Sequence, residues 1–326
     1  MHGLIALVVA ALVTTATLTL TLPWLTRQVL DVPNHRSSHK TPVPRGGGIA
    51  VVLGAVAGIG AGQALAVRDV LVVVIAMLCL AVVGLLDDFG SVPVVRRLVL
   101  QLLVAVALCL LVIRPQVWSD WVLMAGSALV VIGYTNAFNF MDGINAISSL
   151  SIIVCGLWYA GLGLKYDFDA ATVAGLAMAG AAAAFLPWNA PRAKVFLGDV
   201  GSYGLGIASI GLGLTLWWHA APLLAVAAPL AIYVADTGWA LGKRIVGGRD
   251  WQQAHREHVY QRVVDAGWSH LATAVLITAF SLAECALWIL GGNWHESFVV
   301  ASGLAITVAY LSVPTLLQRA ATSARP

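Results

Sequence analysis

Long runs of apolar residues, separated by short polar connectors, make up most of this chain. A helix that crosses a bilayer needs about 20 predominantly apolar residues. By that measure the pattern predicts eleven membrane-spanning helices. Their approximate limits are 2–22, 47–66, 70–86, 98–113, 121–138, 146–164, 172–187, 203–218, 222–241, 271–290 and 298–317. The first lacks a basic leading segment and a small-residue cleavage signature, so we expect a retained span and not a signal peptide.

The composition agrees with this pattern. Hydrophobic residues occupy 60% of the 326 positions, charged residues occupy 10%, and the mean hydropathy is +0.89. Soluble domains carry about 25% charged residues. We therefore expect an all-α polytopic integral membrane protein, with residues 1–326 forming a single membrane-embedded domain. The four cysteines lie in apolar segments without CxxC spacing, which favours packing over a disulfide framework or a zinc site.

The positions of lysine and arginine predict the orientation. The connectors after the odd-numbered spans and the C-terminal tail hold 15 of the 18 cationic residues. Because cytoplasmic loops of membrane proteins are enriched in Lys and Arg, this asymmetry predicts an outside N-terminus and a cytoplasmic C-terminus. The cytoplasmic connectors are then 23–46, 87–97, 139–145, 188–202 and 242–270.

Acidic residues gather at the same predicted face. They lie at or just inside the ends of five different spans, at Asp87, Asp88, Asp142, Asp199 and Asp236. Acids at membrane depth are costly and usually functional. Together they predict a shared site on the cytoplasmic side. Glu284, in the tenth span, is expected to be neutral and hydrogen-bonded, with a proton-linked role as the alternative.

Two motifs carry acids and amides. In GLLDDFGSVPVVRRLVLQ, the adjacent Asp87 and Asp88 suit a divalent metal that also holds phosphate. The alternative is a solvated helix end in which Asp88 pairs with Arg96 or Arg97. In YTNAFNFMDGINAIS, the spacing of three places Asn136, Asn139 and Asp142 on one helix face. A hydrogen-bonded seam between helices is the alternative there.

Two further motifs lie nearer the C-terminus. In FLPWNAPRAKVFLGDVGSYGLG, Gly198 and Gly201 flank Asp199 at a helix start, where backbone can approach phosphate. A tight turn that needs glycine for its geometry is the alternative. In RDWQQAHREHVYQR, His255 and His258 are three residues apart. An interfacial amphipathic helix is the alternative for that segment.

The first cytoplasmic connector contains DVPNHRSSHKTPVPRGGG. Its prolines indicate a defined loop, and Arg36, Lys40 and Arg45 offer positive charge for phosphates. His39 is a candidate for binding phosphate or donor, with a structural hydrogen bond as the alternative.

In this order the five motifs resemble the polyprenyl-phosphate N-acetylhexosamine-1-phosphate transferase superfamily (glycosyltransferase family 4), and the span count resembles its O-antigen-initiating branch. The resemblance implies a multi-pass enzyme of the bacterial inner membrane with its active site on the cytoplasmic side. Such an enzyme joins the sugar phosphate of a UDP-N-acetylhexosamine to undecaprenyl phosphate and releases UMP. It implies Mg²⁺, with Mn²⁺ as an alternative. The expected partners are these substrates, membrane lipids and a second copy in a homodimer, but no nucleic acid.

The resemblance also implies roles for residues. It makes Asp87, Asp88, His255 and His258 catalytic, and makes Asp199 and Asp87 metal ligands. The implied substrate-binding residues are Asn136, Asn139, Asp142, Asn189, Lys194, Arg45, His39, Arg97 and Arg262. The HREH sequence departs from the contiguous histidine cluster of many relatives. A secondary transporter is the alternative class, but its functional polar residues would lie near mid-membrane and not at one face.

Overall fold

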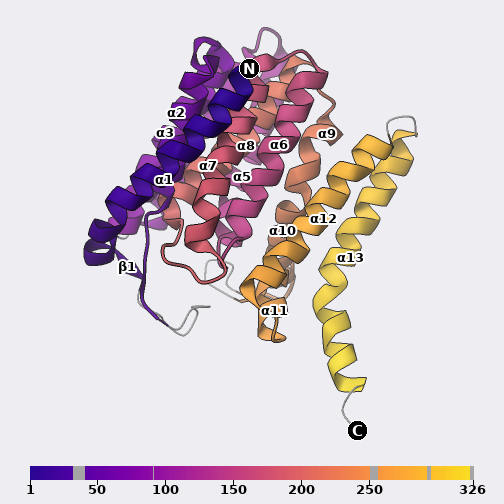
Figure 1. Cartoon of the computed structure of the whole chain (residues 1–326). Coiled ribbons are helices and arrows are strands. Elements are labelled where there is room, and N and C mark those ends of the chain that lie inside the picture. The colour runs from indigo at the N-terminus through magenta and orange to yellow at the C-terminus, as the bar shows by residue number, and fades with distance from the viewer. Residues whose placement is uncertain (32–40, 91, 250–255, 292–294, 324–326) are drawn as a thin grey trace.

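The structure, a computed structural model, describes residues 1–31, 41–90, 92–249, 256–291 and 295–323 of the chain. These residues form a helical bundle with one short antiparallel strand pair, in which Leu30 faces Pro44 and Asp31 faces Val43 (Figure 1). In chain order the elements are α1 (His2–Gln28), β1 (Leu30–Asp31), β2 (Val43–Pro44), α2 (Gly48–Ala61), η1 (Ala64–Ala66), α3 (Arg68–Phe89), α4 (Val94–Ile113), α5 (Trp118–Met141), α6 (Ile147–Lys165), α7 (Asp169–Asn189), α8 (Gly198–His219), α9 (Leu223–Ala227), η2 (Ala228–Leu230), α10 (Ala231–Val246), α11 (Val259–Asp265), α12 (His270–Leu290) and α13 (Glu296–Ser323).

The predicted all-α polytopic fold is confirmed. Among the described residues, ten helical segments are long and apolar enough to cross a membrane, and the segment Leu223–Val246 combines α9, η2 and α10. The predicted span 47–66 is the exception, because α2 has only 14 residues. At 1.5 Å per residue it measures about 21 Å, which is shorter than a hydrocarbon layer of about 30 Å. Gly62 ends α2, and Gln63 follows with a left-handed backbone (φ 66°).

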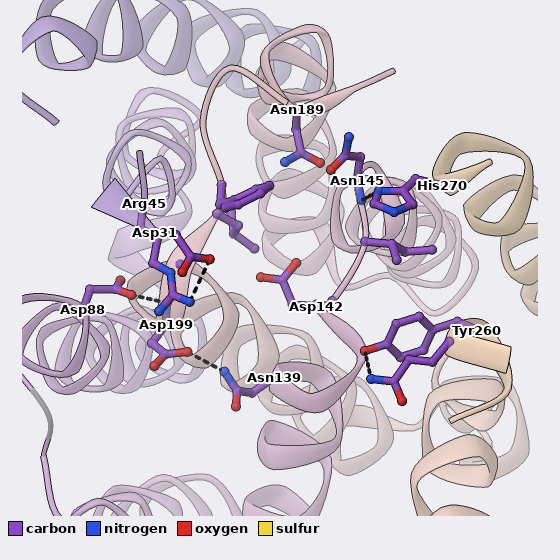
Figure 2. A pocket seen from close by; sticks show the side chains of 16 residues that line it. Asp31, Arg45, Asp88, Asn139, Asp142, Asn145, Asn189, Asp199, Tyr260 and His270 are labelled. Atoms are coloured by element: carbon purple, nitrogen blue, oxygen red, sulfur yellow. Dashed lines mark hydrogen bonds and ion pairs between the residues drawn. The ribbon is translucent and has the colours of Figure 1, made fainter. Parts of the chain in front are cut away.

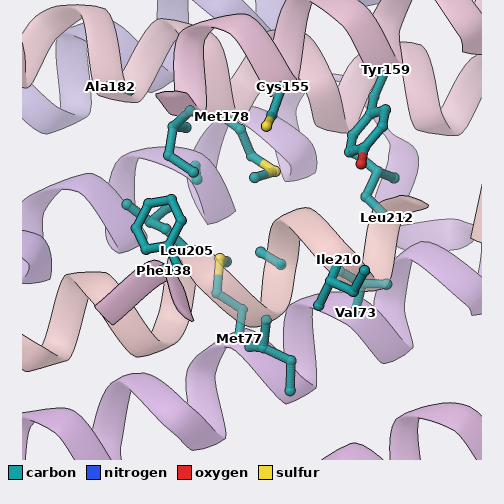
Figure 3. Packing of buried hydrophobic residues seen from close by; sticks show 14 of the residues in the cluster. Val73, Met77, Phe138, Cys155, Tyr159, Met178, Ala182, Leu205, Ile210 and Leu212 are labelled. Carbon is teal, nitrogen blue, oxygen red and sulfur yellow. The ribbon is translucent and has the colours of Figure 1, made fainter. Parts of the chain in front are cut away.

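Helix α8 lies at the centre of the bundle. Its residues from Val200 to Leu216 are all buried, as expected for a helix that is apolar on every side. Figure 3 shows the surrounding side chains. They come from α3 (Val73, Met77), α5 (Phe138), α6 (Cys155, Tyr159) and α7 (Met178, Ala182), and they surround Leu205, Ile210 and Leu212 of α8.

Glycines bring α2 and α3 into backbone contact with the first turn of α8. A Cβ atom on Gly48 would lie 2.3 Å from the Cα atom of Gly201. A Cβ atom on Gly84 would lie 2.1 Å from the carbonyl oxygen of Asp199. Small residues allow this close approach of helices in a membrane protein. The contact places the acidic end of α3 beside the start of α8.

The connectors predicted to be cytoplasmic meet at one end of the bundle, opposite the N-terminus (Figure 1). We call the described parts of 23–46, 87–97, 139–145, 188–202 and 242–270 the site end. Backbone hydrogen bonds join two of these connectors, because the Phe196 N–H donates to the Pro44 carbonyl and the Gly47 N–H donates to the Phe196 carbonyl. Helices α12 and α13 stand at the edge of the bundle, next to α10 and α11 (Figure 1).

The contact at Gly84 gives a stability prediction. Gly84→Ala forces α3 away from α8, so we expect the melting temperature in detergent to fall by several degrees, consistent with the roughly 1–3 kcal/mol cost of overpacking. The matched control is Gly133→Ala in α5, because a Cβ atom there meets nothing within 4 Å. Equal melting temperatures for Gly84→Ala and the wild type would contradict this close packing.

Candidate functional site

A pocket of about 340 Å³ opens at the site end (Figure 2). All five connectors contribute to its walls. The lining residues are Asp31, Arg45, Asp88, Asn139, Asp142, Gly143, Ile144, Asn145, Asn189, Phe196, Leu197, Gly198, Asp199, Tyr260, Gln261 and His270. The lining is thus rich in carboxylates and amides, and within the described chain Arg45 is its single Lys or Arg side chain.

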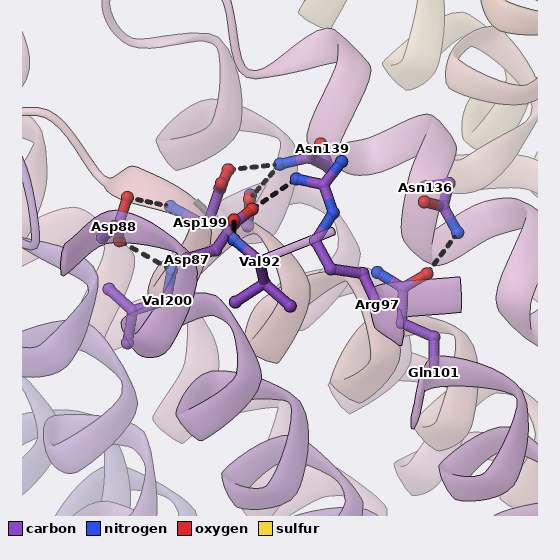
Figure 4. Close-up of polar contacts among 10 residues, drawn as sticks. Asp87, Asp88, Val92, Arg97, Gln101, Asn136, Asn139, Asp199 and Val200 are labelled. Carbon is purple, nitrogen blue, oxygen red and sulfur yellow. Dashed lines mark hydrogen bonds and ion pairs between the residues drawn. The ribbon is translucent and has the colours of Figure 1, made fainter. Parts of the chain in front are cut away.

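Asp88 binds the beginning of another helix. Its Oδ1 accepts the Asp199 N–H at 3.0 Å, and its Oδ2 accepts the Val200 N–H at 3.0 Å (Figure 4). Amides in the first turn of a helix have no partner within that helix, and negative charge is favourable there. Asp88 therefore fixes the start of α8 from the end of α3. The resemblance implies a catalytic role for Asp88, and these two hydrogen bonds give it a positioning role as well.

The side chain of Asp87 turns away from the start of α8 and toward the start of α4. Its Oδ1 accepts the Val92 N–H at 2.8 Å, and its Oδ2 forms an ion pair with Arg97 (Figure 4). Arg97 thus pairs with Asp87 and not with Asp88, whose two carboxylate oxygens accept backbone N–H groups of α8. The carboxyl groups of Asp87 and Asp199 also share a hydrogen bond. Two carboxyl groups in contact require a proton or a cation between them.

The amides of α5 divide between two roles. Asn139 donates from Nδ2 to Asp199 Oδ1 and to Ser202 Oγ, each at 2.8 Å, so it links α5 to α8 in the pocket. Asn136 donates instead to Gln101 Oε1 at 2.8 Å and does not line the pocket. For Asn136 the alternative of a hydrogen bond between helices is therefore the correct one, because its side chain faces α4.

Asp142 follows the end of α5. The Ser148 hydroxyl donates to its Oδ1 at 2.6 Å. Burial, with the negative charges of Asp199 and Asp88, raises the pKa of Asp142 to about 7. Its carboxyl group therefore changes charge near neutral pH.

Arg45 and Asn189 hold the loops around the pocket. Arg45 forms an ion pair with Asp31 at 2.9 Å. The buried Asn189 accepts the Ala146 N–H at 2.6 Å and donates to the Val195 carbonyl at 3.1 Å. It thereby joins the start of α6 to the connector before α8.

Other predicted site residues lie outside the pocket lining. The Lys194 ammonium lies 5.6 Å from the centre of the Trp188 ring, and Arg262 lines a different cavity between α11 and α13. His258 is buried, with Nδ1 at 3.0 Å from Asp236 Oδ1. His39 and His255 lie outside the described residues.

The structure adds lining residues that the sequence analysis did not single out: Asp31, Asn145, Tyr260, Gln261 and His270. Tyr260 and Gln261 belong to the histidine-containing motif, so attention to its whole length would have found them. His270 begins α12 and has no motif around it, although its Nδ1 lies 3.5 Å from the Asn145 backbone nitrogen.

The donor atoms fit a magnesium ion. Within the described residues, no three His, Cys, Asp or Glu side chains are gathered as a metal cluster. The touching carboxyl groups of Asp87 and Asp199, with Asn139 beside them, nevertheless offer the oxygen atoms that Mg²⁺ prefers, and Mg²⁺ usually keeps waters and substrate phosphates as its other ligands.

Several known proteins are similar in sequence to this chain. Residues 70–217 match the family described as Glycosyl transferase family 4. A probable undecaprenyl-phosphate N-acetylglucosaminyl 1-phosphate transferase of Bacillus subtilis (strain 168) is 25% identical over 88% of this chain and 87% of its own length. A decaprenyl-phosphate N-acetylglucosaminephosphotransferase of Mycolicibacterium smegmatis is 28% identical over 75% of this chain and 71% of its own length.

A third relative, a phospho-N-acetylmuramoyl-pentapeptide-transferase of Clostridium botulinum, is 34% identical over 50% of this chain and 49% of its own length. The matched region 70–217 contains Asp87, Asp88, Asn139, Asp142 and Asp199, which meet at the site end. The resemblance to the superfamily is therefore confirmed by the match to glycosyl transferase family 4 and by these relatives, without its O-antigen branch.

Proposed function

We propose that this protein transfers an N-acetylhexosamine-1-phosphate from a UDP-sugar to undecaprenyl phosphate and releases UMP. The observation that supports this most is the polar pocket at one end of an apolar bundle, with carboxylates, amides and Arg45 in its walls. Its volume of about 340 Å³ falls within the roughly 300–1,000 Å³ typical of small-molecule sites. Two of the relatives named above act on undecaprenyl or decaprenyl phosphate, which supports the same acceptor class.

The location follows from the substrates. A UDP-sugar is water-soluble and cytoplasmic, whereas the acceptor carries a long apolar tail that stays in the bilayer. The positive-inside asymmetry supports a cytoplasmic site end, and we propose the bacterial inner membrane as the location of the protein. The donor sugar is N-acetylglucosamine, N-acetylfucosamine or a related sugar, and the product would start a lipid-linked O-antigen or another cell-envelope polysaccharide.

The acceptor phosphate needs positioning more than it needs a strong base. Its second pKa is about 6, so it is mostly dianionic at neutral pH. Mg²⁺ held by Asp87 and Asp199 would neutralise the negative charge that develops during phosphoryl transfer. Asn139 orients Asp199, Asp88 holds the first turn of α8, and Arg45 offers a cation to the diphosphate. Asp142 can accept hydrogen bonds from N–H or O–H groups of the donor.

The proposed reaction predicts a specific requirement for both substrates. Purified protein should release UMP from at least one UDP-N-acetylhexosamine only when polyprenyl phosphate and Mg²⁺ are present. Mass spectrometry of the lipid should then show the added sugar and second phosphate. Absence of UMP across the donor panel would overturn the enzyme proposal, and coupled flux of a solute without lipid product would favour the transporter.

Asp199 provides the test of the metal site. Asp199→Asn should lower UMP release by at least about 100-fold, the order of effect of removing an electrostatic contact to the transition state. Its melting temperature should not fall, because a neutral amide relieves repulsion from Asp87 and Asp88. Asp69→Asn is the matched control, since Asp69 pairs with Arg114 far from the pocket. Full activity in Asp199→Asn would remove Asp199 from the metal site.

The raised pKa of Asp142 predicts an acid limb in the pH profile. An ionised carboxylate accepts stronger hydrogen bonds than a protonated carboxyl group, which also presents an O–H donor. The pH dependence of kcat/KM reports the pKa values of the free enzyme. Because the pKa is raised to about 7, kcat/KM for the UDP-sugar should decrease as the pH falls below about 7 and not below about 4. Asp142→Asn should have a lower kcat/KM without that limb. An unchanged limb in Asp142→Asn would assign it to another group.

A further inference from the structure

Asp236 binds three different parts of the protein. It lies in α10 and is fully buried. Its carboxylate accepts the Val259 N–H at 3.0 and 3.1 Å, lies 3.0 Å from His258 Nδ1, and accepts the Tyr310 hydroxyl at 2.5 Å. One side chain therefore connects α10, the first turn of α11 and α13.

Tyr310 lies on the side of the peripheral helix α13 that faces the bundle. Side chains such as Leu304 and Val308 of α13 are about 60% exposed at the edge of the bundle, which places them toward lipid. Tyr310, by contrast, is fully buried, and its ring packs edge-on against Phe280 of α12 at 5.4 Å. The buried hydroxyl at Asp236 links this outer helix to the interior.

The first turn of α11 forms one wall of the pocket. The hydroxyl of Tyr260, which Figure 2 labels, donates to the Phe140 carbonyl at 3.0 Å, and Gln261 Nε2 donates to the Tyr260 hydroxyl at 3.2 Å. A Cβ atom on Gly143 would lie 2.1 Å from the Tyr260 hydroxyl, so the wall touches the backbone after α5. A displacement of α11 would therefore change the shape of the pocket beside Asp142.

We propose that Asp236 and Tyr310 are positioning residues that hold Tyr260 and Gln261 in the pocket wall, so that α13 shapes the substrate site without touching it. The backbone contact at Val259 lies one residue before Tyr260, and the same carboxylate oxygen that accepts the Tyr310 hydroxyl also accepts this N–H. Loss of the Tyr310 hydroxyl leaves Asp236 bound to α11 but detached from α13. Removal of the Tyr310 hydroxyl thus affects substrate binding through Asp236. This inference rests on the proposed function, because it assumes that the UDP-sugar occupies the pocket.

The test compares two tyrosine-to-phenylalanine changes. Tyr310→Phe removes the hydroxyl at Asp236 and keeps the ring. Tyr159→Phe is the matched control, because Tyr159 is also fully buried and donates to the backbone carbonyl of Val226 at 2.9 Å, outside the pocket lining. Both changes remove one buried hydrogen bond, so both should lower the melting temperature, Tyr310→Phe by more because its acceptor is a carboxylate.

Only Tyr310→Phe should change substrate binding. We expect its KM for the UDP-sugar to rise roughly ten-fold, the equivalent of one lost hydrogen bond to a charged acceptor, while kcat stays within about two-fold of the wild type. The KM of Tyr159→Phe should equal that of the wild type. Combining Tyr310→Phe with Tyr260→Phe should raise KM by less than the product of the single effects, because the two residues act through one wall.

Hydrogen exchange separates this inference from the proposed function. Amide exchange over residues 259–265 should be faster in Tyr310→Phe than in Tyr159→Phe or the wild type. Equal KM values for the two variants, or equal exchange over 259–265, would overturn the positioning role. Absence of UMP from the wild type with every donor would overturn the proposed function alone, because the exchange measurement would still decide whether Tyr310 holds α11.

Discussion

The contact between Asp88 and the first turn of α8 is the interaction on which the site depends. It requires the backbone approach at Gly84, because any side chain there would hold α3 away from Asp199. Once the helices touch, the carboxylate satisfies two amides that α8 cannot satisfy itself. Negative charge at such a helix end contributes up to about 2 kcal/mol in partly buried geometry. The same contact fixes the backbone of Asp199. The packing of α3 against α8 and the position of the Asp199 carboxyl group therefore depend on one contact.

Acidic residues would normally repel one another in such a small volume. Asp88, Asp142 and Asp199 all line the pocket, and Asp87 touches Asp199 behind it. Helix amides offset the charge of Asp88, Arg97 offsets Asp87, and Asn139 donates to Asp199. Asp142 instead takes up a proton near neutral pH. The remaining negative charge would favour a cation in the pocket, and in the proposed function Arg45 and that cation would offset the charge of the substrate phosphates.

Hydropathy was sufficient to predict the helices, because a span is a property of composition over about 20 residues. Hydropathy predicted too long a helix at 47–66, because Gly62 and Gln63 end α2 inside an apolar run. Asp88, Asn139, Asp142 and Asp199 meet in the pocket, because the spans that carry them all reach the same end of the bundle. Spacing alone did not reveal that Asn136 turns toward Gln101, because this depends on where α4 packs. No motif in the sequence indicated a role for Tyr310, because its partner Asp236 lies 74 residues away along the chain.

The short helix α2 has a consequence for the surrounding lipid. It begins at Gly48, in contact with α8 beside the pocket, and ends after 14 residues. A length of about 21 Å does not match a hydrocarbon layer of about 30 Å. A helix shorter than the hydrocarbon layer can be accommodated by local thinning of the bilayer or by flanking residues that reach the interface. Eight of the 14 residues of α2 are buried against neighbouring helices, so the mismatch with lipid is confined to one side of this helix.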